Sequence, residues 1–501
     1  MKPDRLVTPD PQETELKLAL PTSDPAGLAK RLARLPVLAR RTPRREQLHN
    51  VYYDTPDQVL RQRQVALRIR RVGSGAEPRW LQTLKKGGDG GSALSQRGEW
   101  EAPVAGASLS PEALDAKAWA KIDPDGTLFA ALVPCFVTDF ERTIWLVRRR
   151  DGSMVEVALD IGHVAGGDKS APLCELELEL KAGPVSALFV VALQIAAGVA
   201  VLPLNMGKAQ RGYALALDAI HAPVSAAPPV LTANLPLGET VRRVLREMFG
   251  QFTTNLNALR GSDDPEVVHQ GRVAWRRFRS ARRLFKPVLA EANVPSWLPL
   301  QPLMTFLGEL RDLDVARTET LPPLESAYVA GDAHRAGAWD AMAQSLLQAA
   351  SVQRKAVLYA LEDPAVGACL LATTQWIEGL PAAGGAPGNP HKSTPPLRQW
   401  ARRRTTKLHA QLKLARKDAS SPELQHRVRI LAKRTRYGIE ALRSLLPKRI
   451  AQGWHRQATD VQKSIGATRD LEQAVVLLNR MGAEPGLVDF LRGVATGQQT
   501  R

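Results

Sequence analysis

Near its N-terminus the chain carries a row of ionisable side chains at alternate positions. Glu13, Glu15 and Lys17 alternate with Thr14, Leu16 and Leu18 in the stretch QETELKLAL. Such alternation predicts a β-strand, because successive side chains leave a strand on opposite faces. In a single strand, the charged row is most simply explained as a face exposed to solvent. Whether it indicates a functional site therefore depends on whether other strands repeat it.

Other segments of the N-terminal half repeat the pattern in rows of acid and rows of base. In CELELELK, Glu175, Glu177 and Glu179 share one face. Next-but-one carboxylates lie roughly 7 Å apart on an extended strand and repel each other unless a cation lies between them. The other charged rows hold Arg68 and Arg70, Arg97 with Glu99 and Glu101, and Glu156 with Asp160. These rows predict a shared polar interior, which a closed antiparallel barrel supplies because closure gives every strand an inner face.

Length and composition limit the class of protein. A chain of 501 residues predicts two or three domains, and 44% hydrophobic residues suffice for their cores. Cys135, Cys174 and Cys369 are scattered without CxxC spacing, which favours reduced thiols in the cytoplasm over disulfides or zinc. The N-terminus predicts no signal peptide. The longest apolar run, residues 187–204, predicts a buried helix and a turn rather than a membrane span.

The net charge of +18 is concentrated in the C-terminal half. Residues 1–220 hold 29 basic and 26 acidic residues, a net of +3, whereas residues 221–501 hold 39 and 24, a net of +15. We therefore expect the second half to bind a polyanion. Residues 221–237 are rich in Pro and Ala and predict a linker between domains at 11–220 and 238–495.

The C-terminal half has helical periodicity and contains an internal repeat. The segments HQGRVAWRRFR, from His269, and HRVRILAKRTR, from His426, share basic residues three, seven, eight and ten positions after each His. LGELRDLDVA, from Leu307, and IGATRDLEQA, from Ile465, follow at nearly the same spacing. The repeat predicts two related helical bundles. They are expected at about 238–380 and 398–495, joined by the Gly/Pro-rich residues 381–397.

The first repeated segment predicts a basic stripe on one helix. At about 100° per residue, its residues His269, Arg272, Arg276, Arg279 and Arg283 fall within an arc of roughly 80°. No acid occurs from the His to residue 286, so the stripe has no ion-pair partner on its own helix. The counterparts in the second repeat are His426, Arg429, Lys433 and Arg436.

The composition of the stripes favours phosphate without bases as the ligand. Aromatic residues make up only 5% of the chain, and base stacking would need them among the cations. Each His either hydrogen-bonds phosphate or ties its helix to a neighbour. The Arg-Asp pairs that follow, at 311–312 and 469–470, are either part of the site or helix-end salt bridges.

These motifs resemble two known families. The N-terminal half contains, in order, ExExK (Glu13, Glu15, Lys17), NVYYDTPDQVLRQRQVALRIRR, TLKK, TDFERT, EVALDIG, CELELEL and KAQRGY. Together these motifs resemble the CYTH domain of triphosphate tunnel metalloenzymes over residues 12 to about 217. VHQGRVAWRRFRSARRLF and QHRVRILAKRTRYGIEAL resemble the two signatures of a CHAD domain. The combination is similar to bacterial inorganic triphosphatases of CYTH–CHAD architecture.

The resemblance implies a multidomain α+β protein. An eight-stranded antiparallel β tunnel would precede an all-α, duplicated helical-bundle domain. The implied activity is metal-dependent hydrolysis of inorganic triphosphate to pyrophosphate and phosphate, with Mg²⁺ or Mn²⁺ held by carboxylate oxygens, which hard cations prefer. Long-chain polyphosphate is the implied ligand of the helical domain. Nucleic acid and membrane are not expected as partners, and the oligomeric state stays open.

The resemblance also assigns roles to particular residues. The implied catalytic residues are Glu13, Glu15, Lys17 and Glu177. The implied metal ligands are Glu13, Glu15, Asp160, Glu175, Glu177 and Glu179. For one or two of Glu175, Glu177 and Glu179, orienting water is the alternative role. The implied triphosphate-binding residues are Arg68, Arg70, Lys85, Arg97, Arg142, Lys208 and Arg211. The basic stripes of the repeats are the implied polyphosphate site.

Other functions of the same architecture stay open. The tunnel could serve a thiamine triphosphatase or a class IV adenylyl cyclase, or be vestigial in a polyphosphate-binding scaffold. Trp80 and Trp100 are candidates for stacking on a base or ring, although tryptophans on outward strand positions usually pack. A cytoplasmic location is expected, with a possible association with polyphosphate granules.

Overall fold

The computed structural model describes residues 12–21, 24–75, 77–87, 91–289, 294–381, 396–417, 421–464 and 466–499. The chain divides into two compact units. The first contains the residues up to Ala222, together with residues 260–262 and 362–375, and the second contains the remainder. Most of residues 381–397, the expected connection between the repeats, lies outside the described residues.

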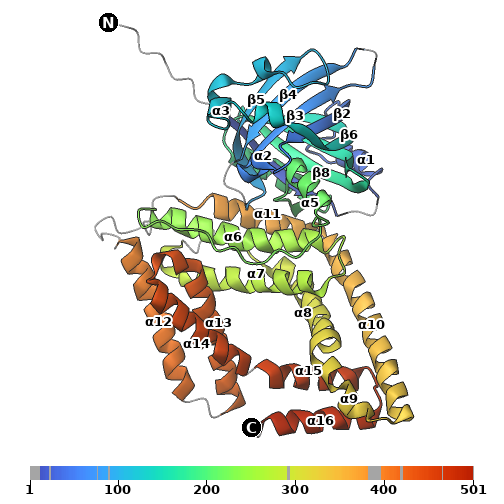
Figure 1. Cartoon of the computed structure of the whole chain (residues 1–501), viewed down its shortest axis with the longest axis vertical. Helices are drawn as coiled ribbons and strands as arrows, with labels where there is room; N and C mark the ends of the chain where they lie inside the picture. The colour runs from blue at the N-terminus through green and yellow to red at the C-terminus, as the bar shows by residue number, and fades with distance from the viewer. Residues whose placement is uncertain are drawn as a thin grey trace. The chain divides into compact units, whose positions relative to one another are not determined.

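The first unit is a closed antiparallel barrel of eight strands, most of them labelled in Figure 1, which confirms the predicted tunnel fold. Its neighbours run β1-β5-β4-β3-β2-β6-β7-β8, and β8 pairs again with β1. The strands are β1 (Gln12–Ala19), β2 (Arg44–Asp54), β3 (Val65–Val72), β4 (Arg79–Lys86), β5 (Leu94–Val104), β6 (Val133–Arg148), β7 (Met154–Gly166) and β8 (Lys169–Ala182). A two-residue strand, β9 (Leu202–Pro203), also pairs with β1.

The apolar faces of the strands form a core outside the barrel. Leu16 and Leu18 of β1 are fully buried there, in one cluster with Leu188 of α4 (Ser186–Ala196). Leu371, from the part of α11 (Pro364–Glu378) that belongs to this unit, completes the same cluster. Because the apolar residues face outward into this core, the charged residues between them must face the barrel interior.

Short helices cover the remaining barrel surface and one end of the interior. They are α1 (Leu28–Ala33), α2 (Val59–Gln62), α3 (Ala116–Ala120) and α5 (Lys208–Ala216). Asp54 fixes α2 and α5 to the end of β2, since its carboxylate accepts from the backbone of Leu60 and Arg61 and from the Tyr213 hydroxyl. Within the barrel end, the Phe136 ring stacks on Tyr52 at 4.7 Å between centroids and meets Tyr213 edge-on.

The second unit is helical (Figure 1). Its helices are α6 (Leu237–Ala258), α7 (Pro265–Leu284), α8 (Gln301–Val315), α9 (Glu325–Val329), α10 (Ala333–Leu361), α12 (Leu397–Lys417), α13 (Pro422–Leu442), α14 (Lys448–Ser464), α15 (Gly466–Arg480) and α16 (Pro485–Gln499). A π-helical turn, Ala316–Thr320, continues α8. Helix α7 packs on α6, α8 and α13, and α13 packs on α12 and α14.

The repeated segments form equivalent helices. Both α7 and α13 begin with a proline, at Pro265 and Pro422, which is favourable because the first helical turn needs no donor there. Asp264 caps α7 and Ser421 caps α13, each by accepting from a backbone N–H. Among the described residues no single helix is long and apolar enough to cross a membrane, although α10 and α11 pass such a test when combined across a bend.

A substitution at Gly212 would test how α5 packs against the aromatic residues at the end of the barrel. A Cβ at Gly212 would lie 2.1 Å from the Phe136 ring, whose other contacts leave it little room to move. We expect Gly212→Ala to destabilise the first unit by about 1–3 kcal/mol, as overpacking typically does.

The measurement is the thermal unfolding midpoint of the full chain. Gly493→Ala in α16 is the control, because its Cβ would meet nothing within 4 Å and alanine favours a helix. A Gly212→Ala midpoint at or above the wild-type value would show that α5 does not pack as described.

Candidate active site in the barrel and basic surface of the helical unit

The barrel encloses a cavity of about 840 Å³. The inward residues of the strands, together with the start of α5, line it. Most site residues expected from the sequence therefore come together in one space. Those lining the cavity are Glu13, Glu15, Lys17, Arg68, Arg70, Lys85, Arg97, Arg142, Glu177, Glu179 and Lys208.

Glu13 stands between two cations on neighbouring strands. Its carboxylate accepts from Lys85 at 2.8 Å and from Arg97 at 3.0 Å. Burial alone would raise the pKa of Glu13, but Lys85, Arg97 and Lys17 outweigh burial and hold the pKa well below its usual range. Glu13 is therefore a fixed anion at neutral pH.

Lys17 and Arg142 neutralise Glu177 from two sides. The Lys17 ammonium donates to Glu177 and, at 2.7 Å, to Glu15. Arg142 donates to Glu177 at 2.6 Å. Burial opposes the charge of Glu177, but Lys17, Lys208 and Arg142 together hold its pKa far below the usual value.

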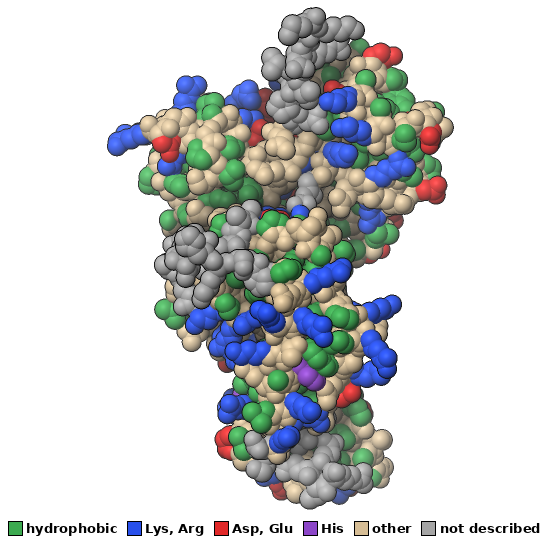
Figure 2. Space-filling model, turned by 90° about the vertical axis from the view of Figure 1, so that its left-hand side faces the viewer, with side chains coloured by type: hydrophobic (Ala, Val, Ile, Leu, Met, Phe, Trp, Pro, Cys, Tyr) green, Lys and Arg blue, Asp and Glu red, His purple; other side chains and the backbone are tan. Residues whose placement is uncertain are grey.

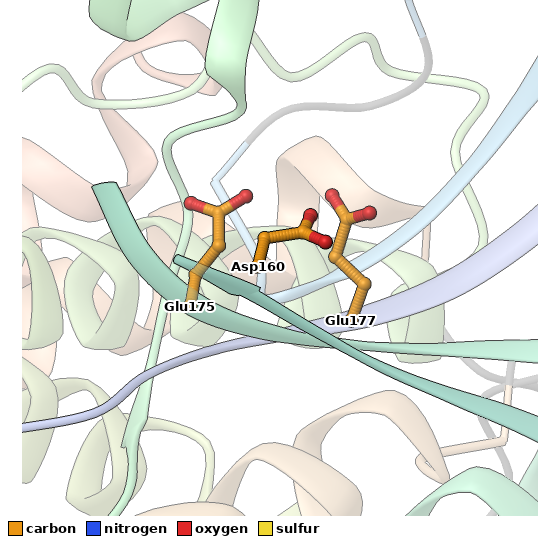
Figure 3. Close-up of side chains that lie close together, drawn as sticks. All are labelled: Asp160, Glu175 and Glu177. Carbon is orange, nitrogen blue, oxygen red and sulfur yellow. The ribbon is translucent and has the colours of Figure 1, made fainter. Parts of the chain in front are cut away.

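Asp160, Glu175 and Glu177 form a group that we call the carboxylate cluster. One oxygen from each lies within 4.8 Å of the others, and Figure 3 shows the three side chains turned to the same side of β7 and β8. Lys208 lies among them, with its ammonium 2.6 Å from Asp160, 2.6 Å from Glu175 and 3.0 Å from Glu177. Asp160 and Glu175 are fully buried and lie beside the cavity rather than on its wall.

The carboxylate cluster fits a divalent cation chemically. All its donors are carboxylate oxygens, the ligands preferred by Mg²⁺ and Mn²⁺. Within the described part of the chain, Glu175 Oε2 is buried without a hydrogen-bond partner, and Arg211 lies 3.7 Å from it. Of the other expected ligands, Glu13 and Glu15 are held by Lys and Arg, and Glu179 pairs with Lys181 at 2.6 Å.

Arg68 and Arg70 give the opposite wall of the cavity an excess of positive charge. Arg70 donates to the Asn50 side chain at 2.8 Å and makes no ion pair with the residues described. Burial first, and then the nearby cations Arg68 and Arg142, lower the pKa of Arg70 to about 10. Arg68 makes one ion pair within the described part of the chain, a long one of 4.0 Å to Glu99. An anion in the cavity would relieve this repulsion.

Besides Asp160 and Glu175, three further residues considered from the sequence do not line the cavity. Arg211 turns toward Glu175 and donates to the carbonyl oxygen of Pro172 at 3.3 Å. Trp80 and Trp100 are also absent from the described lining, and Trp100 packs on an apolar cluster outside the barrel. No tryptophan among the described residues is therefore positioned to stack on a ring in the cavity.

The cavity also contains residues that were not assigned a role from the sequence. Tyr52 is almost fully buried, lines the cavity, and its hydroxyl oxygen accepts from Arg68 at 3.4 Å. The alternation within residues 44–54 could have revealed it, because Tyr52 shares its parity with Asn50. Other lining residues of this kind are Arg44, Glu46, Arg79, Glu99, Glu101, Glu156 and Lys181.

In the helical unit, the stripes of α7 and α13 approach each other. Burial first, and then Arg429, Arg276 and further arginines, lower the pKa of Lys433 to about 8. Arg276 comes from α7, whereas Arg429 and Lys433 come from α13, so the two repeats present cations to the same region. Arg276, Arg429 and Lys433 make no ion pair with any carboxylate among the described residues.

The histidines and the Arg-Asp pairs surround this region. His426 contacts Arg469 of α15 through its Nδ1 at 3.1 Å, so it ties α13 to a neighbouring helix. Burial and then Arg311 lower the pKa of His269. Arg311 pairs with Glu319 of the π-helical turn at 2.7 Å. The Arg-Asp motifs thus join neighbouring elements rather than pairing internally.

Helix α12 adds a basic face that was not assigned from the sequence. It contains no acidic residue. Its exposed cations are Arg398, Arg402, Arg403, Lys407, Lys413, Arg416 and Lys417. Figure 2 shows Lys and Arg side chains spread over the helical unit on the side that carries α12, with few Asp or Glu. The absence of acids along α12 was the signal for this surface.

Comparison with known proteins agrees with both units. Residues 11–213 match the CYTH domain family, and residues 243–479 match the CHAD domain family. The chain therefore carries a CYTH domain followed by a CHAD domain and belongs to the CYTH–CHAD class of proteins.

The chain is also similar to particular proteins. It is 34% identical over 205 residues to an inorganic triphosphatase of Haemophilus influenzae, a match that covers 41% of this chain and 55%, about half, of that protein. A CHAD domain from the plant Ricinus communis is similar at 27% identity and a TM-score of 0.47, over 56% of this chain and 92% of that one. A putative adenylyl cyclase from Hippeastrum, described as having a dominant triphosphatase activity, is similar at 19% identity and a TM-score of 0.31, over 40% and 95% of the two chains.

Asp160 tests the strength of the buried charge network. Asp160→Asn would place an amide against the donors Arg142 and Lys208, leaving these buried cations short of negative charge. Breaking a buried pair in this way typically costs about 3–5 kcal/mol. We expect a correspondingly lower urea midpoint for the first unit. Asp151→Asn, at a half-exposed surface pair with Arg149, should change stability by less than about 0.5 kcal/mol. Equal effects of the two variants would contradict the network.

Proposed function

We propose that the barrel hydrolyses inorganic triphosphate to pyrophosphate and phosphate. The observation that carries the proposal is a closed cavity in which cations without full compensation face a cluster of carboxylates. The 34% sequence identity to an inorganic triphosphatase over 205 residues also supports inorganic triphosphate as the substrate. A short, highly charged anion needs several fixed cations, and the cavity lining supplies them.

The cavity residues divide the work of the reaction. Arg68 and Arg70 would bind the phosphate oxygens, since arginine forks suit phosphate geometry. Arg70 makes no ion pair with the residues described, and Arg68 makes only the long one to Glu99. Lys85 and Arg142 would neutralise the charge that passes to the leaving pyrophosphate. Glu177, which stays ionised and lines the cavity, would orient a water for attack by accepting its hydrogen bond.

The carboxylates are proposed to hold a divalent metal. The residues suited to it are the carboxylate cluster, with Glu13, Glu15 and Glu179 as further ligands or water-orienting groups. When bound there, Mg²⁺ or Mn²⁺ supplies polarisation of the phosphoryl oxygens. Lys17 holds Glu15 and Glu177 in place beside this site.

The lining favours inorganic triphosphate over nucleotide or thiamine triphosphate. The aromatic residues among the described lining are Tyr52 and Tyr213, and both already pack against Phe136. The described lining offers a base or thiazolium ring no aromatic side chain beyond these two. Thiamine triphosphatase activity and a vestigial tunnel are alternatives that the next experiment separates, whereas an adenylyl cyclase would be detected by cyclic AMP and pyrophosphate formed from ATP.

We expect phosphate release from tripolyphosphate to exceed release from ATP and thiamine triphosphate under identical conditions. The measurement compares the three substrates with Mg²⁺, with Mn²⁺ and with a chelator. Activity should disappear with the chelator. Equal or faster hydrolysis of ATP, or no hydrolysis of any substrate, would overturn the proposal.

Glu13→Gln and Glu15→Gln should abolish metal-dependent activity while leaving the fold largely intact. Each substitution keeps the shape of an inward side chain but removes a negative charge of the tunnel. Activity is measured at saturating Mg²⁺, and circular dichroism checks the fold. Glu112→Gln, at an exposed site outside the barrel strands, is the control. Wild-type turnover in both tunnel variants would refute their role.

We also propose that the CHAD domain binds long-chain polyphosphate through the stripes of α7 and α13. The support is the cluster of cations from both repeats that lacks carboxylate partners in the described chain, together with the net charge of +15 in residues 221–501. Domain limits of 11–220 and 238–495, a cytoplasmic location, and association with polyphosphate granules belong to the same proposal.

Polyphosphate affinity should fall at least about tenfold when Arg276, Arg429 and Lys433 are changed together to alanine. The full chain is used, because residues 362–375 belong to the first unit. The matched control changes Arg402, Arg403 and Lys407, which removes the same charge from the exposed face of α12, outside the two stripes. Affinity should weaken steeply with salt. Equal losses in both variants, or displacement by equimolar nucleic-acid phosphate, would show a general polyanion surface.

The lowered pKa of the Lys433 side chain predicts that polyphosphate binding depends on pH. Its pKa of about 8 means that the side chain is charged at pH 7 and mostly neutral at pH 9.5. Polyphosphate favours the charged form, so affinity should fall severalfold between these pH values at constant ionic strength. Lys433→Arg stays charged and should remove most of this loss. An unchanged pH profile in Lys433→Arg would contradict the assignment.

A further inference from the structure

Lys208 holds an unusual position for a residue expected to bind substrate. Its ammonium contacts all three members of the carboxylate cluster at 3.0 Å or less. Its side chain is almost fully buried, and its other close neighbour is the Phe140 ring, 5.1 Å away. Burial alone would lower the pKa of Lys208, but Asp160, Glu175 and Glu177 raise it well above its usual value. Lys208 is therefore positively charged while it lies among these carboxylates.

The charges of the carboxylate cluster are already balanced. The three carboxylates meet Lys208, Arg142 and Lys17 at close range, with Lys17 shared with Glu15, and Arg211 lies 3.7 Å from Glu175. A divalent cation added to this arrangement would bring two further positive charges into a buried site. Repulsion between close charges of like sign costs several kcal/mol in such surroundings. One resident cation has to leave for the metal to bind well.

Of the cations within hydrogen-bond distance of the carboxylate cluster, Lys208 is the one most easily released. Arg142 uses two nitrogen atoms to hold both oxygens of Asp160, and Lys17 lies in the middle of β1, fixed by the sheet. Lys208 is instead the first residue of α5, and its charge sits at the end of a flexible four-carbon stem. It also lines the cavity, so its ammonium has somewhere to go.

We propose that Lys208 is the counter-ion of the carboxylate cluster in the metal-free protein, and that a divalent cation binds by displacing it. The released ammonium then reaches the phosphates in the cavity, so metal and triphosphate favour each other's binding. The proposal rests on the metal dependence proposed above. It gives one lysine two successive partners, carboxylate before the metal binds and phosphate afterwards.

The test measures Mn²⁺ binding to the full chain without substrate, by the electron paramagnetic resonance signal of free Mn²⁺. Lys208→Gln should bind Mn²⁺ at least about tenfold more tightly than the wild type, because the competing charge is gone. Arg70→Gln is the matched control. It removes one positive charge from the same cavity but not from the carboxylate cluster, and should change affinity by less than about threefold.

Thermal unfolding gives a second reading that allows for a destabilised variant. Without metal, Lys208→Gln should melt below the wild type, because three buried carboxylates lose a counter-ion. Mn²⁺ should raise its midpoint more than it raises that of the wild type. Weaker or unchanged Mn²⁺ binding by Lys208→Gln, or equal tightening in Arg70→Gln, would overturn the displacement. Absence of Mn²⁺ binding by every variant would overturn the proposed metal dependence as well.

Discussion

The compensation of buried charge inside a closed barrel is the constraint on which the first unit depends. Closure sends every second side chain of eight strands into one interior, and in this chain those side chains are largely ionisable. Isolated charges would be prohibitively costly there. In the structure these charges are compensated by a network of ion pairs, such as Glu13 with Lys85 and Arg142 with Asp160. Such a network tolerates, and at Arg70 favours, the arrival of an anion.

The fold was predictable from the sequence to the extent that it rests on local periodicity. Alternation of charged and apolar residues identified the strands around Glu15 and Glu177, and closure followed from the need to share a polar interior. The 157-residue repeat likewise identified α7 and α13 as equivalents. Sequence periodicity carried no signal that residues 362–375, from the helical half, would complete the outer core of the barrel. That contact depends on packing between segments far apart in the chain.

For the site, the sequence likewise predicted which face of a strand a side chain lies on, but not which partner it meets. Strand parity placed the carboxylates and arginines on the inner face, because side-chain direction in a strand is local. It left open which acid meets which base, since that depends on the register between strands. Lys208 illustrates the limit. Its motif suggested phosphate binding, whereas only the position of α5 against β7 and β8 brings its ammonium among Asp160, Glu175 and Glu177. Arg211, one turn later, faces Glu175 and the Pro172 carbonyl.

The charged interior of the barrel is the proposed binding site for triphosphate and a divalent metal. A crystal structure of the full chain with tripolyphosphate and Mn²⁺ tests it most directly, because the anomalous signal of manganese locates the ion independently. We predict manganese against the tunnel carboxylates and phosphate oxygens within hydrogen-bond distance of Arg68 and Arg70. Phosphate and manganese bound only outside the barrel, with the internal pairs unchanged, would contradict the account.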